Sequence, residues 1–238
     1  MYAKKILSIF GDSIMKGLVF SPSRERYILS DGLRIPELAD RYSIEIQNFS
    51  RVGCTIDKGV AMIKRRIDEG AKYDYIFLEY GGNDCDFNWK AVAASPRDEH
   101  LPFTPLDKFT CSYYELISYL RSEGIKPVMA NLPPVSASRY LRWICRDGLS
   151  RDSILEWLGD ENAIYRYQET YSRRIEEISR DTGTPLINLR DAFLSHRRIE
   201  ELICVDGIHP NEQGQKIINE AIQEGFDALS RAAGSKAV

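Results

Sequence analysis

The chain has 238 residues, of which 43% are hydrophobic and 28% charged, so it is long enough to build one sizeable core of ordinary globular composition. Its 32 basic and 35 acidic residues are interleaved along the sequence. We therefore expect neither nucleic acid nor a membrane surface as a partner, because both select blocks of basic residues. No apolar run reaches the roughly 18 residues that a transmembrane helix needs.

The N-terminus and the cysteines bear on location and on metal binding. Lys4-Lys5 leads straight into a strand-like segment without a cleavage site, so we expect a cytoplasmic protein, or a secreted one if a leader preceded this sequence. The five cysteines show no CxxC spacing, which argues against a disulfide framework and against a zinc site. We expect reduced thiols, no metal and no cofactor.

The predicted elements alternate between strand and helix along the chain. Strands are predicted at 6–10, 43–49, 74–80, 127–132 and 185–189, and helices at 34–42, 56–69, 106–121, 165–180 and 211–229. A short apolar helix is also predicted between Ser13 and Phe20, with a loop after it. This alternation predicts one α/β domain with a doubly wound, five-stranded parallel sheet.

Small and polar residues follow the first three predicted strands. Ser13, Gly53 and Asn83 each lie just beyond a strand end, and in such sheets ligands bind outside the carboxyl ends of the strands. A serine at this place, near the unpaired N–H groups of a helix start, is well placed as a nucleophile. The alternative is structural, because Gly11-Asp12-Ser13 is also a common helix cap.

The sequence contains three histidines, and one of them has the spacing of a general base. His209 follows Asp206 by three residues, so one turn can bring the carboxylate to the imidazole Nδ1–H while Nε2 faces outward. In the alternative interpretation, Asp206 caps the last helix. His100 and His196 lie in charged segments and are interpreted as surface residues.

Three groups could supply the donors that a tetrahedral oxyanion needs: the backbone N–H groups of Ser13 and Gly53 and the side-chain amide of Asn83. Each also has a structural interpretation. Gly53 would permit a positive φ in a tight turn, and Asn83-Asp84 would form a turn pair.

Taken together, these residues resemble the four signature blocks of the SGNH (GDSL-like) hydrolases. The blocks are Gly11-Asp12-Ser13, Gly53, Gly82-Asn83-Asp84 and Asp206-x-x-His209-Pro210, and they occur in that order across almost the whole chain. The resemblance implies a flavodoxin-like three-layer α/β/α sandwich and ester hydrolysis without a metal.

By the same resemblance, Ser13 is the nucleophile, His209 the base and Asp206 the acid that orients it. Gly53 and Asn83 complete the oxyanion hole with the Ser13 amide. Arg51 and the additional Gly81 depart from the expected blocks, which affects the acyl-binding side. The α/β-hydrolase signature G-x-S-x-G is absent around Ser13.

Two long insertions, at about 85–105 and 135–164, leave from the carboxyl ends of predicted strands within the single domain 1–238 and are expected to form a cap. They hold all three tryptophans. The candidate substrate-binding residues are Asp12, Trp89, Arg142 and Trp143. Aromatic faces beside arginine favour a short acyl group such as acetyl on a carbohydrate-like alcohol. Alternatively, these aromatics form the cap's own core or a dimer contact.

Two functional classes follow from these patterns. The first is a serine esterase acting on a small-molecule ester. The second is a catalytically inactive module on the same fold that binds a small anion or a sugar. A flavin-binding protein lacks support, because the loop after the first strand offers only Ser13 as a hydroxyl for phosphate.

Overall fold

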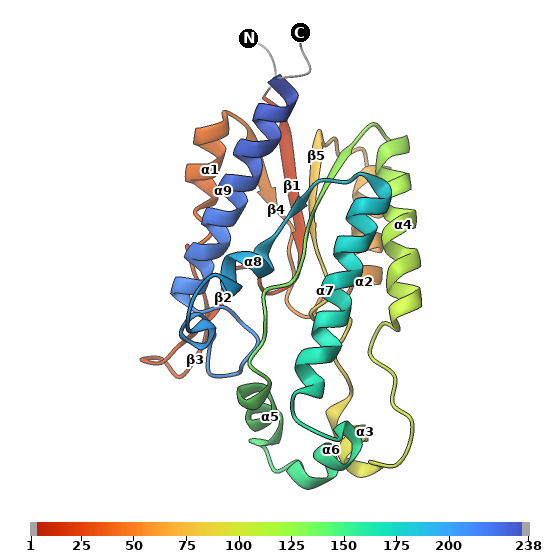
Figure 1. Cartoon of the computed structure of the whole chain (residues 1–238). Helices are drawn as coiled ribbons and strands as arrows, with labels where there is room; N and C mark the ends of the chain where they lie inside the picture. The colour runs from red at the N-terminus through yellow and green to blue at the C-terminus, as the bar shows by residue number, and fades with distance from the viewer. Residues whose placement is uncertain (1–3, 235–238) are drawn as a thin grey trace.

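A computed structural model describes residues 4–234, and Figure 1 shows a central sheet between two layers of helices. The sheet has five parallel strands in the order β4-β1-β5-β6-β7. Their bounds are β1 (Ile6–Gly11), β4 (Glu45–Asn48), β5 (Tyr75–Glu79), β6 (Lys126–Ala130) and β7 (Leu186–Ile187). The predicted five-stranded parallel sheet is therefore confirmed, although the last strand is shorter than expected.

Helices cover both faces of this sheet. One layer contains α2 (Ile56–Asp68), α4 (Leu106–Ser122) and α7 (Ala163–Thr182), and the other contains α1 (Ile35–Tyr42), α8 (Leu189–Leu194) and α9 (Glu212–Gly234). Strand β5 shows why two cores form. Ile76 and Leu78 pack into the first core and Phe77 into the second, because successive strand side chains point to opposite faces. The three-layer sandwich is confirmed.

The short helix predicted between Ser13 and Phe20 is wrong. Residues 13–17 form turns, and an antiparallel hairpin of β2 (Leu18–Ser21) and β3 (Arg26–Leu29) follows. Gly17 has a φ of 79°, and this positive φ ends the turn before β2. Ser30 N–H donates to the Gly17 carbonyl at 2.7 Å, which joins the two ends of the hairpin.

A third group of helices lies below the carboxyl ends of the strands in Figure 1, and we call it the cap. It consists of α3 (Trp89–Ala94), α5 (Ala137–Cys145), α6 (Arg151–Leu158) and the beginning of α7. Val92, Leu141 and Ile154 are fully buried in a core of its own. These helices arise from the two insertions at 85–105 and 135–164. A short 3-10 helix, η1 (Ile199–Leu202), precedes the last loop.

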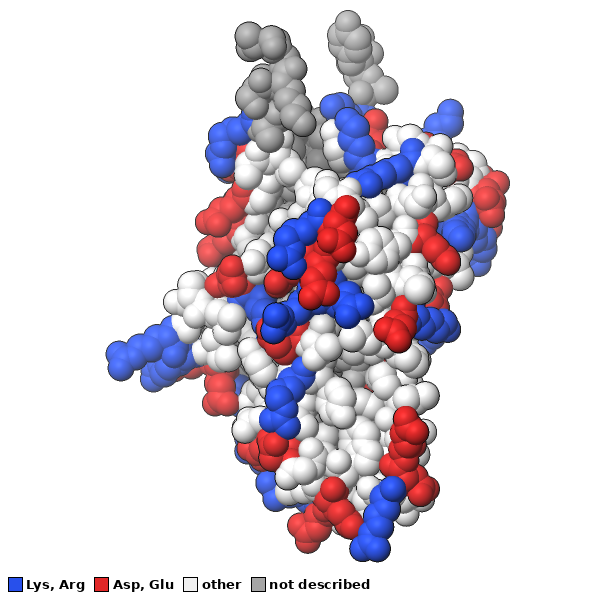
Figure 2. Space-filling model, turned by 45° about the vertical axis from the view of Figure 1, so that its right-hand side comes forward, with Lys and Arg blue, Asp and Glu red and all other residues white. Residues whose placement is uncertain are grey.

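Two observations describe the surface. On the face shown in Figure 2, basic and acidic side chains are interspersed, without a large patch of one sign. Across residues 4–234, no helix combines the length and the apolar character needed to cross a membrane.

Candidate active site

Ser13 lies in the turn that follows β1. The side chains of Asp12 and Ser13 are almost completely buried, with 2% and 6% of the residue surface exposed. Asp12 Oδ1 accepts the Ile14 N–H at 2.8 Å and so fixes the turn around the serine. Asp12 therefore caps a turn rather than a helix.

The chain brings His209 from the last loop to this serine. His209 Nε2 lies 2.8 Å from Ser13 Oγ, and His209 Nδ1 donates to Asp206 Oδ2 at 2.5 Å. Asp206 Oδ1 accepts the backbone N–H groups of Ile208 at 3.0 Å and of His209 at 3.1 Å. Both carboxylate oxygens therefore hold the loop and the imidazole in one arrangement.

The last helix does not use Asp206 as its cap. Helix α9 begins at Glu212, and Asn211 Oδ1 accepts the N–H groups of Gln213 and Gly214 at 3.0 and 3.1 Å. Asp206 is 1% exposed, and burial opposes its ionisation. Hydrogen bonds from His209 and Tyr27 outweigh that effect and lower the pKa of Asp206, so the carboxylate stays charged beside the imidazole.

Gly53 and Asn83 lie at the ends of the neighbouring strands and line the same pocket as Ser13 and His209. Gly53 has a φ of 69°, so it does occupy the turn conformation that favours glycine. Asn83 Nδ2 donates to Asp12 Oδ2 at 2.9 Å and to the Cys54 carbonyl at 3.3 Å. Among residues 4–234, the backbone N–H groups of Ser13 and Gly53 find no protein acceptor.

A second carboxyl group lies beneath this turn. Glu79, at the end of β5, is fully buried and pairs with Gly11 of β1 in the sheet register. Neither of its oxygens receives a hydrogen bond from a donor group in the described part of the chain. Burial next to Asp12 raises the pKa of Glu79 well above its ordinary value, which favours the neutral acid, the form that can donate to Asp12.

The pocket in front of Ser13 has a volume of about 180 Å³. Its outer wall is aromatic, and the cap contributes Trp89, Tyr140 and Tyr167. Asp86 links two of these side chains, because it accepts the Trp89 indole N–H at 2.8 Å and the Tyr140 hydroxyl at 2.7 Å. The lining contains no lysine or arginine among the described residues.

Two of the four predicted substrate-binding residues, Asp12 and Trp89, line this pocket, and two do not. Arg142 is exposed on α5. Trp143 packs edge-on against Tyr27, with ring centroids 6.1 Å apart, and the Arg146 guanidinium lies over the Trp143 ring, 3.9 Å from its centroid. Arg142 and Trp143 therefore lie outside the pocket lining, at a surface position and a packing position.

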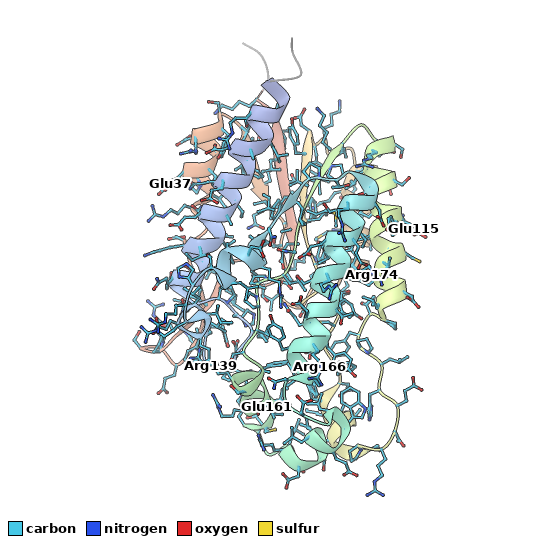
Figure 3. The ribbon with its side chains drawn as sticks, viewed as in Figure 1. Glu37, Glu115, Arg139, Glu161, Arg166 and Arg174 are labelled. Carbon is cyan, nitrogen blue, oxygen red and sulfur yellow. The ribbon has the colours of Figure 1, made fainter. Side chains whose placement is uncertain are left out.

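Other residues of the two insertions also lie outside the pocket lining. Arg139, labelled beside α5 in Figure 3, donates to the carbonyls of Glu200 and Ile203. Phe103 is 59% exposed. His100 bonds through Nε2 to the Ser95 carbonyl at 2.9 Å, away from the site.

Several site residues escaped the sequence analysis. Tyr27, Tyr167 and Gln168 reach the triad or the pocket from the hairpin and from α7. The sequence signal near Tyr27 is the turn-forming Ser21-Pro22-Ser23 segment before it, which does not by itself specify a hairpin. In residues 4–234, no cluster of three or more His, Cys, Asp and Glu side chains is placed to hold a metal ion.

The comparison with solved structures supports the fold. A lipase/acylhydrolase from Enterococcus faecalis matches with a TM-score of 0.63 and 17% identity, over 95% of this chain and 96% of that one. The psychrotrophic esterase EstA from a Pseudoalteromonas species matches with a TM-score of 0.60 and 16% identity, over 96% and 100%. A catalytic mutant of an acetylxylan esterase from Geobacillus stearothermophilus matches with a TM-score of 0.61 and 16% identity, over 94% and 95%.

At these identities the structural likeness shows the shared fold. The comparison with curated proteins finds no match. The family model of the GDSL-like lipase/acylhydrolases matches residues 9–217, which is most of the chain. The chain therefore belongs to the GDSL-like lipase/acylhydrolase family and is a serine carboxylic ester hydrolase.

Proposed function

We propose that Ser13, His209 and Asp206 form the catalytic triad of this hydrolase. The observation that carries the proposal is the continuous line of hydrogen bonds from Ser13 Oγ through both imidazole nitrogens to Asp206 Oδ2, at 2.8 and 2.5 Å. In a triad the carboxylate holds the imidazole in one tautomer, so that Nε2 can accept the proton of the nucleophile.

The reaction then follows from this arrangement. His209 Nε2 takes the Ser13 proton while Oγ attacks the ester carbonyl carbon. The backbone N–H groups of Ser13 and Gly53 donate hydrogen bonds to the oxyanion. The Asn83 amide donates a third, with the N–H that otherwise makes the long hydrogen bond to the Cys54 carbonyl. The intermediate expels the alcohol, which receives the proton from His209. Water, deprotonated by the same imidazole, then hydrolyses the acyl-enzyme.

For the substrate, we propose an ester with a short acyl group such as acetyl, on a carbohydrate-like alcohol. The small pocket, its aromatic wall and the absence of a cation among the described lining residues support a compact, neutral ester. One fold neighbour is an acetylxylan esterase, which makes acetylated xylan fragments a sensible first probe.

Covalent labelling tests the nucleophile. A fluorophosphonate probe is expected to tag wild type at Ser13, identified by mass spectrometry of the labelled peptide. Ser13→Ala is expected to lose the tag and all measurable turnover while its thermal unfolding stays close to that of wild type. Absence of labelling in folded wild type would favour the alternative, an inactive module that binds a small anion or a sugar.

A substrate panel tests the acyl and alcohol sides separately. We expect kcat/KM to be highest for acetyl among acetyl, butyryl and octanoyl esters of one aryl alcohol. With acetyl fixed, an acetylated xylo-oligosaccharide is expected to exceed a simple alkyl acetate. A preference for octanoyl esters would contradict the proposed acyl group without affecting the triad.

A further inference from the structure

Tyr27, on β3 of the hairpin, contacts two members of the triad at once. Its hydroxyl donates to Asp206 Oδ2, the same oxygen that accepts the His209 Nδ1 proton. Its ring lies against the imidazole, with centroids 5.2 Å apart and planes inclined by 56°. One side chain therefore bonds to the acid and packs on the base.

The hairpin is fixed to the loop that carries the acid. Phe20 N–H donates to Cys204 Sγ at 3.3 Å, two residues before Asp206 in the sequence. The Tyr27 ring is held edge-on by Phe20 and Trp143, with centroids 5.4 and 6.1 Å away. Tyr27 therefore has little freedom to leave the carboxylate.

The hydroxyl can only act as a donor at this place. Burial, together with the hydrogen bond and negative charge of Asp206, raises the pKa of Tyr27 far above its ordinary value of 10.0. The phenol therefore keeps its proton throughout the working range of an imidazole base. Besides His209 and the two backbone N–H groups, Tyr27 is the donor that reaches this carboxylate within the described residues.

We propose that Tyr27 is a positioning residue that tunes the acid–base pair through Asp206; this inference rests on the triad proposed above. A donated hydrogen bond draws negative charge from Oδ2 and weakens the support that the carboxylate gives to a protonated imidazole. The ring also restricts imidazole rotation away from Ser13 Oγ.

Several other polar and charged groups surround the imidazole, and the hydrogen bond from Tyr27 to Asp206 can be changed separately from them. Asp12 and Ser13 face His209 from the turn after β1, and Cys204 lies in the same loop as Asp206. Charged groups farther out around the hairpin and the loop are Arg139, Arg146 and Glu212. None of these three bonds to the Asp206 carboxylate in the described structure. The hydroxyl of Tyr27 can therefore be removed without changing any of them.

The test is Tyr27→Phe, which removes the hydroxyl and keeps the ring. We expect the acid limb of the pH profile of kcat/KM to move up by about half a pH unit. Activity at pH 6 then falls roughly threefold relative to wild type, while KM and the activity at pH 8.5 stay nearly unchanged. Tyr27→Leu, which also removes the ring, is expected to lower kcat at every pH.

Tyr42→Phe is the matched control. Tyr42 also donates to a carboxylate, Asp227 Oδ1 at 2.8 Å, and to the Gln223 carbonyl, between α1 and α9 and away from the pocket. Its loss is expected to reduce stability by an amount similar to the loss of the Tyr27 hydroxyl and to leave the pH profile in place. An acid limb of Tyr27→Phe that stays at its wild-type position, or moves to lower pH, would overturn the proposal.

An NMR titration separates this inference from the proposed function. The protein has three histidines, so the imidazole signals can be assigned with His100→Gln and His196→Gln. In Tyr27→Phe the His209 midpoint is expected to rise, whether or not the protein turns over. A Ser13→Ala variant that keeps activity would end the triad proposal alone, whereas an unmoved His209 midpoint would end the Tyr27 proposal alone.

Discussion

At the scale of single residues, the site depends on the hydrogen-bond partners of the Asp12 carboxylate. Its Oδ1 fixes the serine turn through Ile14 N–H, and its Oδ2 holds the Asn83 amide at 2.9 Å. A fully buried carboxylate in this position needs a further donor, because burial disfavours its charge and raises the pKa of Asp12. A proton on the neighbouring Glu79, whose pKa burial also raises, can supply that donor.

Replacing Glu79 by Gln or Met distinguishes the effect of its hydrogen-bond donor from the effect of its volume. Gln keeps a donor toward Asp12, so kcat on an aryl acetate is expected to remain within about threefold of wild type. Met fills the space without a donor, and kcat is expected to fall by roughly tenfold as the Asn83 amide loses its fixed position. Equal loss in both variants would show that the acid proton is unimportant, with thermal unfolding of each variant as the check on folding.

The residues that could be predicted from sequence are those with a local signal. Ser13, Gly53 and Asn83 follow strand ends, so the sheet topology brings these three residues to one edge. Asp206 and His209 share one turn, and their spacing pairs them with each other. Tyr27 had no such signal, because it meets Asp206 across 179 residues of sequence. The prediction for Arg142 and Trp143 rests on the composition of their segment, and composition does not say which face of α5 meets the pocket.

At the scale of elements, Asp84 connects the loop after β5 to helix α2. Its carboxylate oxygens accept the Ile56 N–H at 3.0 and 3.2 Å, while the N-cap residue Thr55 makes no side-chain cap bond. This bond fixes the end of the turn that contains Gly53. Burial raises the pKa of Asp84 to about 7, so the folded state holds a proton there that the unfolded chain loses near 3.8.

Asp84→Asn and Asp84→Ala are expected to differ in stability and in its pH dependence. A raised pKa in the folded state means that this group's contribution is present below pH 4 and declines as the pH rises toward 7, by up to about 1.4 kcal/mol per pH unit. Asn keeps an acceptor for Ile56 N–H and removes that slope. Ala leaves the N–H unpaired and is expected to cost about 1–2 kcal/mol at pH 4.

Urea unfolding of the three proteins between pH 4 and 8 measures both effects. The difference between Asp84→Asn and wild type isolates this carboxyl from every other titrating group. A constant difference across the range would contradict a folded-state pKa near 7.

The alternation of strands and long helices was predictable because each buried strand or helix face leaves its own period in the sequence. The β2–β3 hairpin was not, since Leu18 to Phe20 is too short to separate strand from helix by period. Its identity comes from Gly17, whose positive φ stops a helix, and from the hydrogen bond of Ser30 that closes the hairpin.

At the scale of the whole molecule, the chain builds two cores on the sheet and a smaller one in the cap. The cap core contacts the outer aromatic wall of the pocket, because Phe87 packs against both Trp89 and Tyr167. At its edge lie two exposed ion pairs, Arg166–Asp160 and Arg151–Glu161, near the junction of α6 and α7 where Figure 3 labels Arg166 and Glu161. Exposed pairs contribute little, so apolar packing holds the cap together.

Truncating one buried side chain of the cap tests whether it opens separately from the sheet. Ile154 in α6 is fully buried in the cap core, and Ile63 in α2 is fully buried in a core on the sheet. Each change to Ala is expected to cost about 2–5 kcal/mol. For Ile154→Ala, hydrogen exchange is expected to speed up in α3, α5 and α6 first, and KM to rise as the aromatic wall loosens. Ile63→Ala is expected to lower global stability and leave KM near its wild-type value, and the same exchange pattern in both variants would contradict a separately opening cap.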